Sequence, residues 1–281
     1  MSISILRRSL TGACTVTAAL LASALCVTSG AAASTSTGDI LDYWTTSRMA
    51  SATGADAPTR TAPAAPAPAL LAELTRAPRP YTDADTRVHG KVFYTRSGGR
   101  DSWCSASVVT APNRSLVWSA AHCLSGTTRV LFVPAYNSAG TGDAPYGRWP
   151  ARRVVTSGND HAVVVVSQVG GRYLQDVVGA NGIRFTGPVD GRTTIWGYPA
   201  ARIWTGRDLT YCHQPTRPDG GSTTTACDTE GGSSGGGYVT GNATPTGLGH
   251  LWANHTAGSG ATAYGSVFGS TAKRLYDANS S

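Results

Sequence analysis

The sequence predicts an all-β protein made of two packed antiparallel β-barrels with a short C-terminal helix. Three observations lead to this fold class. Short runs rich in β-branched or aromatic residues follow one another from about residue 86, turn-forming Gly, Pro, Asn and Asp separate them, and no regular alternation of strands and helices appears. Roughly 200 residues of such strands suit two barrels of about 100 residues each, which we expect at 81–180 and 181–281.

The predicted strands are short and closely spaced. In chain order they are 88–95, 105–110, 116–119, 129–133, 152–156, 161–167, 193–198, 208–212, 237–240, 250–254 and 263–268. The valine run within 161–167 is so uniformly apolar that it must be buried on both faces. The helix is expected at 271–278.

The first 33 residues have the order of a secretory signal peptide. Arg7 and Arg8 precede a charge-free, Ala/Leu-rich run at 18–27, and three alanines at 31–33 come before Ser34. The apolar run is shorter than the roughly 20 residues that span a bilayer. We therefore expect a signal peptide at 1–33 and a secreted, extracellular protein with no membrane contact after its removal.

Residues 34–80 differ in composition from the rest of the chain. A Pro/Ala stretch at 62–68 favours extended, unpaired backbone and offers little to bury. The segment 34–80 is either a removable pro-segment or a disordered linker. The folded domain is then expected at 81–281.

Composition excludes several protein classes. The chain is 41% hydrophobic, and its 34 glycines follow no G-X-Y period, so neither a wholly disordered chain nor collagen fits. The formal net charge is +7, but only Lys91 and Lys273 are lysines and the arginines are spread along the chain. Because nucleic-acid-binding proteins gather their cations on one arm or helix, we expect no nucleic-acid partner.

Four cysteines remain once the two in the signal segment are removed, and a secreted chain with an even number implies disulfides. Four cysteines allow three pairings. Pairing neighbours, Cys104 with Cys123 and Cys212 with Cys227, closes two short loops, each worth about 3 kcal/mol in the chain-entropy estimate. A zinc site is the competing interpretation, but no pair has C-x-x-C spacing, and we expect no metal.

Three segments carry residues suited to nucleophilic catalysis. In the first, an apolar strand ends in small residues and presents His122 beside Cys123, a good place for a base. In the second, Asp160 directly precedes the buried valine run, where a carboxylate persists only if donors surround it, and an imidazole N–H is a suitable donor. The competing interpretation of Asp160 is a turn cap.

In the third segment, 227–238, glycines flank Ser233 and Ser234. A nucleophile attacking a carbonyl needs close approach of the backbone, because N–H groups hold the developing oxyanion and side chains would obstruct it. The competing interpretation is a flexible Gly/Ser loop.

Taken together, the three segments resemble the trypsin-like (chymotrypsin-fold) serine peptidases, and within them the secreted bacterial branch related to glutamyl endopeptidases. The matching blocks are 120–123 for A-x-H-C around the catalytic His, 160–162 for D-x-A, 232–236 for G-x-S-G-G, and 197–199 for G-Y-P with Cys212 a little later. The resemblance covers about residues 88–270.

This resemblance implies a secreted serine endopeptidase, a monomer that acts on protein or peptide substrates and needs no cofactor. It makes His122 the base, Asp160 the partner of the imidazole and Ser234 the nucleophile, with the backbone N–H groups of Gly232 and Ser234 as the oxyanion hole. Ser233 lies in the G-x-S-x-G string of lipases and esterases, but there the serine comes first and a helix follows it. The order of residues favours Ser234.

The chain departs from the family pattern in places. Ser233 replaces the Asp that commonly precedes the nucleophile and no I-V-G-G start appears, so activation through an ion pair with a new N-terminus is not expected. Removal of an inhibitory pro-segment stays open. Gly237 stands where Pro is usual, which bears on the shape of the oxyanion loop. A catalytically inactive trypsin-like binding module is the alternative function.

The strand 251–256 resembles the segment that lines the primary specificity pocket and pairs with the substrate backbone. We assign substrate binding to His255 and Asn254, since glutamate-specific relatives use a His in this region to meet the substrate carboxylate. A structural histidine is the competing interpretation of His255. The histidines expected to be structural are His89, His161, His213 and His250.

Overall fold

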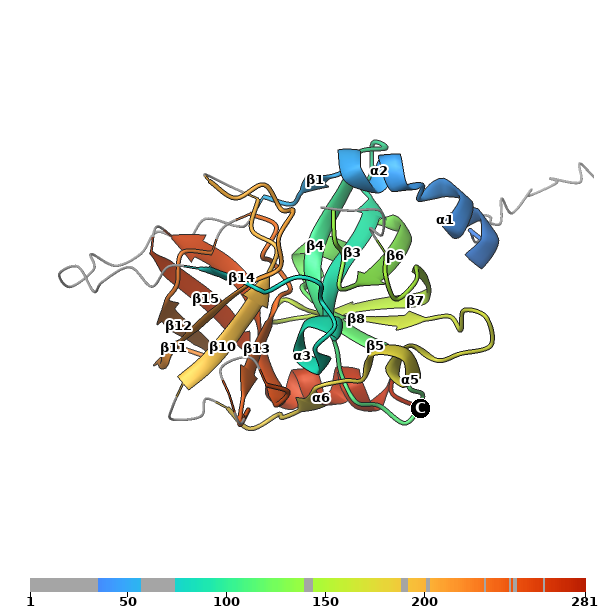
Figure 1. The fold of residues 1–281 in the computed structure, drawn as a ribbon. Coiled ribbons are helices and arrows are strands. Elements are labelled where there is room, and N and C mark those ends of the chain that lie inside the picture. The colour runs from blue at the N-terminus through green and yellow to red at the C-terminus, as the bar shows by residue number, and fades with distance from the viewer. Residues whose placement is uncertain are drawn as a thin grey trace, which may run out of the picture. The chain divides into compact units, whose positions relative to one another are not determined.

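The computed structural model describes residues 35–56, 74–138, 144–187, 192–200, 203–229, 231–242, 244, 247–259 and 261–281. The predicted signal peptide and the Pro/Ala stretch at 62–68 lie outside these ranges. The described residues belong to one structural unit, Thr35–Ser281. Figure 1 shows its two β-barrels, the first in cyan to green and the second in orange to red.

The first barrel is a closed antiparallel sheet of six strands. They are β3 (His89–Thr95), β4 (Asp101–Val108), β5 (Leu116–Ser119), β6 (Thr128–Pro134), β7 (Trp149–Ser157) and β8 (His161–Val166). Their order is β4-β3-β6-β7-β8-β5, and pairing of β5 with β4 closes the barrel. This confirms the predicted fold class for the first half of the chain.

The second barrel also has six antiparallel strands. They are β10 (Arg192–Gly197), β11 (Thr210–Asp219), β12 (Ser222–Ala226), β13 (Gly237–Thr240), β14 (His250–Ser259) and β15 (Thr262–Val267). Their order is β10-β13-β14-β15-β12-β11, closed by β11 on β10. The sequence did not predict β12, a Thr-rich run that returns along β11 after a turn at Gly220 and Gly221.

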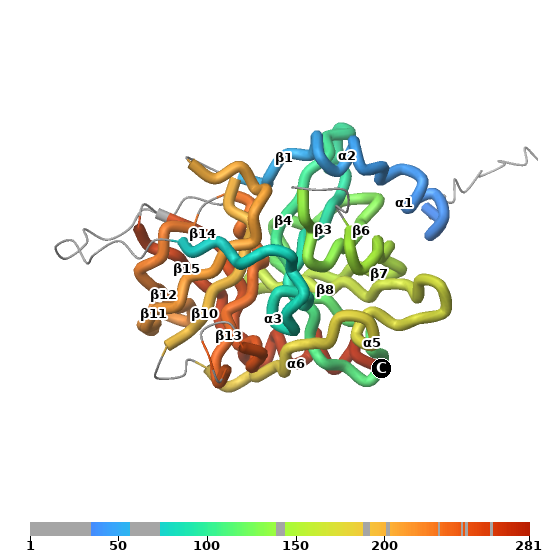
Figure 2. The backbone as a smooth tube through the Cα atoms, viewed as in Figure 1, coloured from blue at the N-terminus to red at the C-terminus, as the bar shows by residue number. Residues whose placement is uncertain are grey.

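Shorter elements connect and flank the barrels. They are α3 (Ala84–Arg87), α4 (Ala121–Leu124), α5 (Leu174–Val178), α6 (Ser270–Asp277) and the two-residue strands β2 (Thr75–Arg76) and β9 (Gly182–Ile183). Helix α6 confirms the predicted C-terminal helix and lies below the first barrel in the view of Figure 2. It buries Ala272 and Leu275, which share one face because they are three residues apart.

The valine run of β8 explains how Asp160 comes to lie at the edge of a buried strand. Val163 and Val165 pack in one apolar cluster, whereas Val164 and Val166 pack in another. Successive side chains of a strand point to opposite faces, so a strand covered on both faces must be apolar throughout. Asp160 directly precedes this strand, in the turn that joins it to β7.

The described part of the N-terminal segment, ahead of the Pro/Ala stretch, contains regular secondary structure. Residues 35–56 form α1 (Thr37–Tyr43), α2 (Thr46–Ser51) and β1 (Thr53–Gly54), and Figure 1 shows α1 and α2 beside one end of the first barrel. The side chains of Ile40, Trp44 and Met49 are buried in an apolar cluster shared with that barrel. These three large apolar side chains give residues 35–56 the burial that the composition of the Pro/Ala stretch does not offer.

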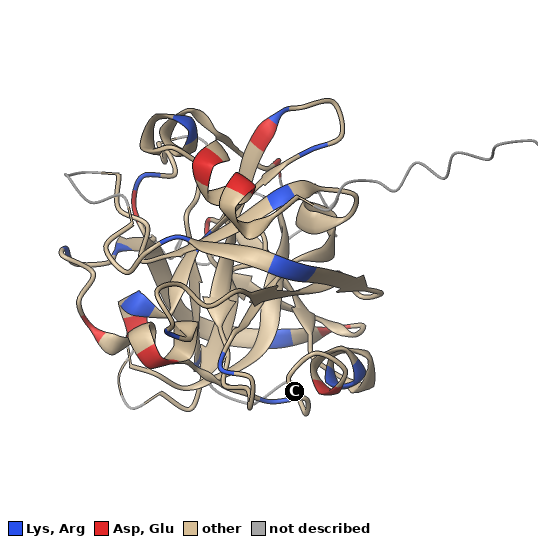
Figure 3. Ribbon diagram, turned by 90° about the vertical axis from the view of Figure 1, so that its right-hand side faces the viewer, with Lys and Arg blue, Asp and Glu red and all other residues tan. Residues whose placement is uncertain are grey.

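Charged residues are mixed over the surface. In Figure 3, Lys and Arg positions alternate with Asp and Glu positions on several elements rather than gathering on one. Across the described ranges, no helix has both the length and the apolar character needed to cross a membrane.

Candidate active site

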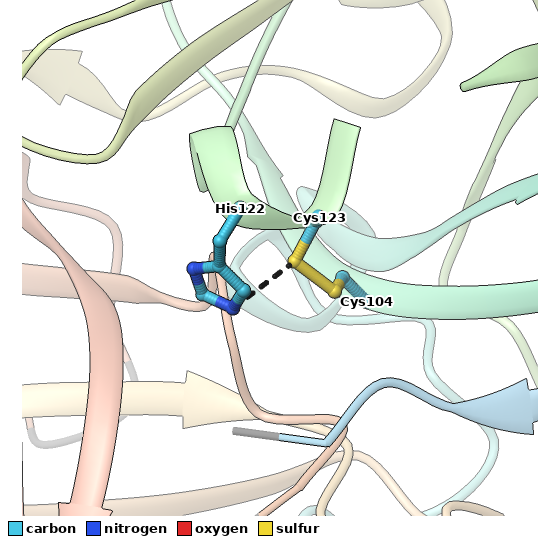
Figure 4. Close-up of side chains that lie close together, drawn as sticks. All are labelled: Cys104, His122 and Cys123. Carbon is cyan, nitrogen blue, oxygen red and sulfur yellow. Dashed lines mark hydrogen bonds between the residues drawn. A yellow bond between two sulfur atoms is a disulfide. The ribbon is translucent and has the colours of Figure 1, made fainter. Parts of the chain in front are cut away.

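His122 is held by the first barrel and by a disulfide. Strand β5 ends at Ser119, and the chain then turns through α4, which carries His122 and Cys123. Cys123 is bonded to Cys104 of β4, as the sequence predicts, and Figure 4 shows the imidazole beside this disulfide. The His122 Nε2 atom lies 3.6 Å from Cys123 Sγ, and the side chain is 22% exposed. The backbone of His122 is thus fixed while its ring keeps access to solvent.

His122, Cys104 and Cys123 are also close enough together to resemble a metal site. Both sulfur atoms are joined in the disulfide, so neither is a thiolate that could ligate a metal. The second pair of neighbours, Cys212 and Cys227, forms the other disulfide of the described residues.

Asp160 lies in the turn between β7 and β8. Asn159 and Asp160 both have positive φ, 61° and 59°, a conformation that Asn and Asp tolerate better than other non-glycine residues. The turn directs the carboxylate at His122: Oδ2 accepts from Nδ1 at 2.8 Å, and Oδ1 accepts from the His122 main-chain N–H at 2.8 Å. Two N–H groups of one residue therefore set the position of this carboxylate.

Thr256 of β14 supplies a further donor to Asp160 Oδ2 from the second barrel. Burial alone would raise the pKa of Asp160, but the hydrogen bonds from His122 and Thr256 outweigh it, and the pKa lies below the ordinary value for Asp. Asp160 is therefore a carboxylate at neutral pH and can stabilise a positive charge on the imidazole.

Ser234 lies in the loop that leads into β13. Its carbonyl oxygen accepts from the Ser105 N–H at 2.9 Å, and Ser105 directly follows the disulfide-bonded Cys104. On the other side, the Gly235 N–H donates to the His255 carbonyl at 2.8 Å. The loop is therefore held between β4 of the first barrel and β14 of the second, next to the turn that carries His122.

The Ser234 Oγ atom is buried and has no hydrogen-bond partner among the described residues. The structure thus brings His122 and Asp160 into contact. The next residue of the loop, Gly235, lies against Ser119 and Ala120, just before the helical turn with His122, and no hydrogen bond joins Ser234 to His122 among the described residues. Ser233 Oγ is buried without a partner as well, but it lies against Gly197 of β10.

Two glycines give the loop its shape. Gly232 has φ +88°, and a Cβ there would meet the Trp103 ring at 2.6 Å. Gly235 has φ +80°, and a Cβ there would overlap Ser119 and Ser105. Larger residues fit neither position, because both the dihedral and the space exclude a side chain. The backbone of this loop thus packs directly against Trp103, Ser105 and Ser119, which only glycine allows at these two positions.

The side chains of His255 and Asn254 lie on opposite faces of β14, because the two residues are neighbours along a strand. His255 is fully buried, with Nε2 3.3 Å from Thr229 Oγ1 and Nδ1 3.3 Å from the Tyr238 hydroxyl. Burial lowers the pKa of His255 to about 3, so its imidazole is neutral.

Asn254 points the other way, toward the first barrel. Its Oδ1 accepts from Trp118 at 3.2 Å and lies 2.9 Å from His161 Nδ1, and its Nδ2 donates to the Asp160 carbonyl at 3.1 Å. The side chain of Asn254 is therefore engaged by the fold, where it holds the backbone of Asp160 in place, and the substrate-binding role of this residue stays a prediction.

Sequence reasoning missed two residues that shape the site, Ser105 and Thr256. Each directly follows a residue that the sequence had singled out, Cys104 or His255. Their polar side chains within β-branched or apolar runs were the available signal. An open groove of about 580 Å³, lined by α2, Thr53, Arg100 and Asp101, includes none of the predicted catalytic residues.

Two solved structures resemble this chain in both fold and sequence. The protease Anisep from Arthrobacter nicotinovorans is 31% identical, with a TM-score of 0.63, and the match covers 70% of this chain and 97% of Anisep. The thermostable serine protease AL20 from an extremophilic microorganism is 33% identical, with a TM-score of 0.64, and the match covers 70% of this chain and 99% of AL20. The chain belongs to the chymotrypsin-fold serine proteases.

Two more distant structures share the fold alone. HL collagenase and the scabies mite inactivated protease paralogue S-I1 are each 16% identical, with TM-scores of 0.50 and 0.51. The second is an inactivated paralogue, so the fold does not by itself establish activity. No protein-family model and no curated protein matches the sequence.

Proposed function

We propose that this protein is a secreted serine endopeptidase that hydrolyses peptide bonds through His122, Asp160 and Ser234. The observation that carries the proposal is the contact between His122 Nδ1 and Asp160 Oδ2 at 2.8 Å, beside a glycine-shaped loop that bears Ser234. The known activity of the related serine proteases supports it. No step of this chemistry requires a metal or an organic cofactor.

In this mechanism Ser234 Oγ attacks the carbonyl carbon of the scissile bond while His122 Nε2 takes its proton. The proton then passes to the leaving amine, and the acyl-enzyme is hydrolysed by water through the same steps. Asp160 fixes the Nδ1–H tautomer and stabilises the imidazolium. Catalytic hydrogen bonds are often long without substrate, so Ser234 Oγ is expected to approach Nε2 in the complex.

The oxyanion hole consists of the backbone N–H groups of Gly232 and Ser234. Their loop is braced by Ser105, whose side chain donates to the Gly232 carbonyl at 2.8 Å and whose N–H binds the Ser234 carbonyl. Preorganised donors of this kind are each worth about 10²–10³ in kcat. Gly237, where the family commonly has Pro, is buried against Leu251 and Ser107, which limits the freedom of the backbone there.

We propose that the enzyme prefers substrates with an acidic side chain just before the scissile bond, as glutamyl endopeptidases do. The neutral imidazole of His255 and the hydroxyl groups of Thr229 and Tyr238 can all donate to a carboxylate. Preferential cleavage of a peptide library after Glu supports the assignment to His255, whereas cleavage without an acidic preference contradicts it.

We further propose that the protein is secreted, is a monomer and acts on protein or peptide substrates. The basic, apolar and small-residue order of residues 1–33 supports export, and the two disulfides suit an oxidising compartment. N-terminal sequencing and size-exclusion chromatography of the secreted product test processing and oligomeric state together.

The alternative is an inactive binding module. It is favoured by the burial of Ser234 Oγ without a hydrogen-bond partner among the described residues and by the inactivated protein with the same fold. Labelling with an aryl phosphonate, followed over hours so that a slow reaction is detected, separates the two. We expect an adduct on Ser234 that Ser234→Ala abolishes and the matched Ser233→Ala variant keeps. No adduct at all would support the binding module.

A further inference from the structure

The segment after α2 runs from the N-terminal helices directly to the candidate oxyanion loop. Residues Thr53 and Gly54 pair in parallel with Ser102 and Trp103 of β4. Ala55 then donates its N–H to the Trp103 carbonyl at 2.9 Å, and its own carbonyl accepts from the Gly232 N–H at 2.8 Å. Figure 1 shows this segment, β1, passing from the first barrel toward the second.

The contact at Gly232 uses a main-chain donor that the proposed mechanism needs. A backbone amide has one N–H, and the N–H of Gly232 is already donated to the Ala55 carbonyl. The Ala55 oxygen therefore stands where the proposed function requires the carbonyl oxygen of a substrate. Ala55 is 2% exposed and Ser234 is fully buried, so solvent does not reach the candidate nucleophile while Ala55 is bound to Gly232.

We propose that residues Thr53–Ala55 fill the peptide-binding groove beside Ser234 and withhold the Gly232 N–H, so that the full chain is a self-inhibited form of the enzyme. This inference rests on the proposed function. The groove is the exposed edge of β4 with the oxyanion loop, and its occupant is an extended strand of the same chain, held by main-chain hydrogen bonds.

The helices before this segment explain why it stays in place. The indole N–H of Trp44 donates to the Arg129 carbonyl at 2.5 Å, and Arg148 donates to the Trp44 carbonyl at 2.7 Å. Arg48 forms an ion pair of 2.6 Å with Asp101 at the start of β4. With α1 and α2 anchored in this way, the segment is present at high effective concentration, and a substrate must compete with it.

A closer anchor lies beside the groove itself. The Trp103 indole donates to the Ala52 carbonyl at 3.2 Å, and a Cβ on Gly54 would meet Ala200 at 2.8 Å and the Trp103 ring at 3.1 Å. Gly54 therefore fits because it lacks a side chain. In contrast, a Cβ on Gly38 of α1 would meet only Ser36, at 3.7 Å.

The experiment compares the full chain with two variants that weaken this contact in different ways. Gly54→Leu introduces a side chain where none fits, and Ala55→Pro removes the N–H that bonds Trp103. Gly38→Leu is the matched control in the same segment. The rate of phosphonate labelling at Ser234 and the hydrolysis of a peptide ester are measured, with thermal unfolding and intact mass as checks of folding and cleavage.

We expect both variants to react at least about tenfold faster than the full chain, up to the roughly 10²–10³-fold that one oxyanion donor is worth, and the control to match the full chain. Equal rates in all four proteins would overturn the self-inhibition and leave the proposed function intact. Slower reaction of both folded variants would also overturn it, because the segment would then support the oxyanion loop. Spontaneous cleavage after Ala55 would make the segment a substrate rather than an inhibitor.

The remaining outcome concerns the proposed function. If none of the four proteins is labelled at Ser234 although all unfold cooperatively, the chain is not a peptidase, and the inference is lost with it. The two failures are therefore distinguished by whether the full chain reacts.

Discussion

Replacing Asp160 with Asn tests the candidate triad most directly, because the structure determines how the amide must lie. The His122 main-chain N–H lies 2.8 Å from Oδ1, so this position must keep an oxygen that accepts. The amide nitrogen then takes the place of Oδ2, 2.8 Å from Nδ1 of His122. A donor at that place favours the tautomer in which Nδ1 accepts, against the longer contact of 3.0 Å between Nδ1 and Oδ1. In that tautomer the ring proton lies on Nε2, where it blocks proton transfer from Ser234.

The expected loss follows from this tautomer. An imidazole with its proton on Nε2 cannot act as the base, and in Ser-His-Asp triads this substitution lowers kcat by about 10⁴-fold, equivalent to about 5.4 kcal/mol of transition-state stabilisation. The assay is hydrolysis of an activated peptide ester in the Gly54→Leu background, so that self-inhibition does not mask the change.

The matched control is Asp176→Asn. Asp176 also accepts a hydrogen bond from a side chain, that of Arg114 at 2.8 Å, but the Asp176 side chain is 43% exposed, and we expect less than a twofold change in kcat. If Asp160→Asn keeps more than a tenth of the kcat, the assignment of Asp160 as the partner of His122 is refuted.

Three further predictions concern the loop, the disulfide and the buried histidines. Gly235→Ala should abolish labelling at Ser234, because its φ of +80° and the overlap with the first barrel displace the loop, whereas Gly158→Ala, which meets nothing within 4 Å, should leave labelling unchanged. Replacing Cys104 and Cys123 together by Ser should lower the free energy of unfolding by about 3 kcal/mol in urea titrations; no change would refute the chain-entropy argument. Burial lowers the pKa of His89 to about 3, so the native state binds no proton where the unfolded state does, and stability should fall by about 1.4 kcal/mol per pH unit as pH drops from about 6.5 toward 3. The variant His89→Gln should lose that slope, and an unchanged slope would contradict the assignment.

The sequence predicts the strands well because their signal is local. Eleven runs of β-branched and aromatic residues correspond to strands of the two barrels, although several ends differ. The run Ser222–Ala226 was missed because it is polar and only the pairing with β11 and β15 makes it a strand. Helices α1 and α2 were missed because they have fewer than eight residues each, and the burial of Trp44 against the first barrel, not a helical period, fixes them.

For the candidate site, too, local patterns in the sequence were informative and contacts between distant residues were not. His122, Asp160 and Ser234 were found because each belongs to a short block whose neighbours are small or glycine. The directions of the Asn254 and His255 side chains were not predicted, because sequence identifies a strand but not which face each residue takes: a shift of one residue separates Asn254, facing Trp118, from His255, facing Tyr238. The contact of Ala55 with Gly232 could not be predicted, because it joins residues far apart in the chain through main-chain atoms alone.

Three consecutive residues of β4 each serve a different part of the molecule. Trp103 binds the N-terminal segment, Cys104 holds the turn with His122, and Ser105 braces the loop with Ser234. Directed evolution of new specificities should leave this tripeptide untouched, because each of its residues holds a different part of the candidate site. The side chains of Thr229 and Tyr238, which contact the His255 imidazole, offer a starting point for redesign outside this tripeptide.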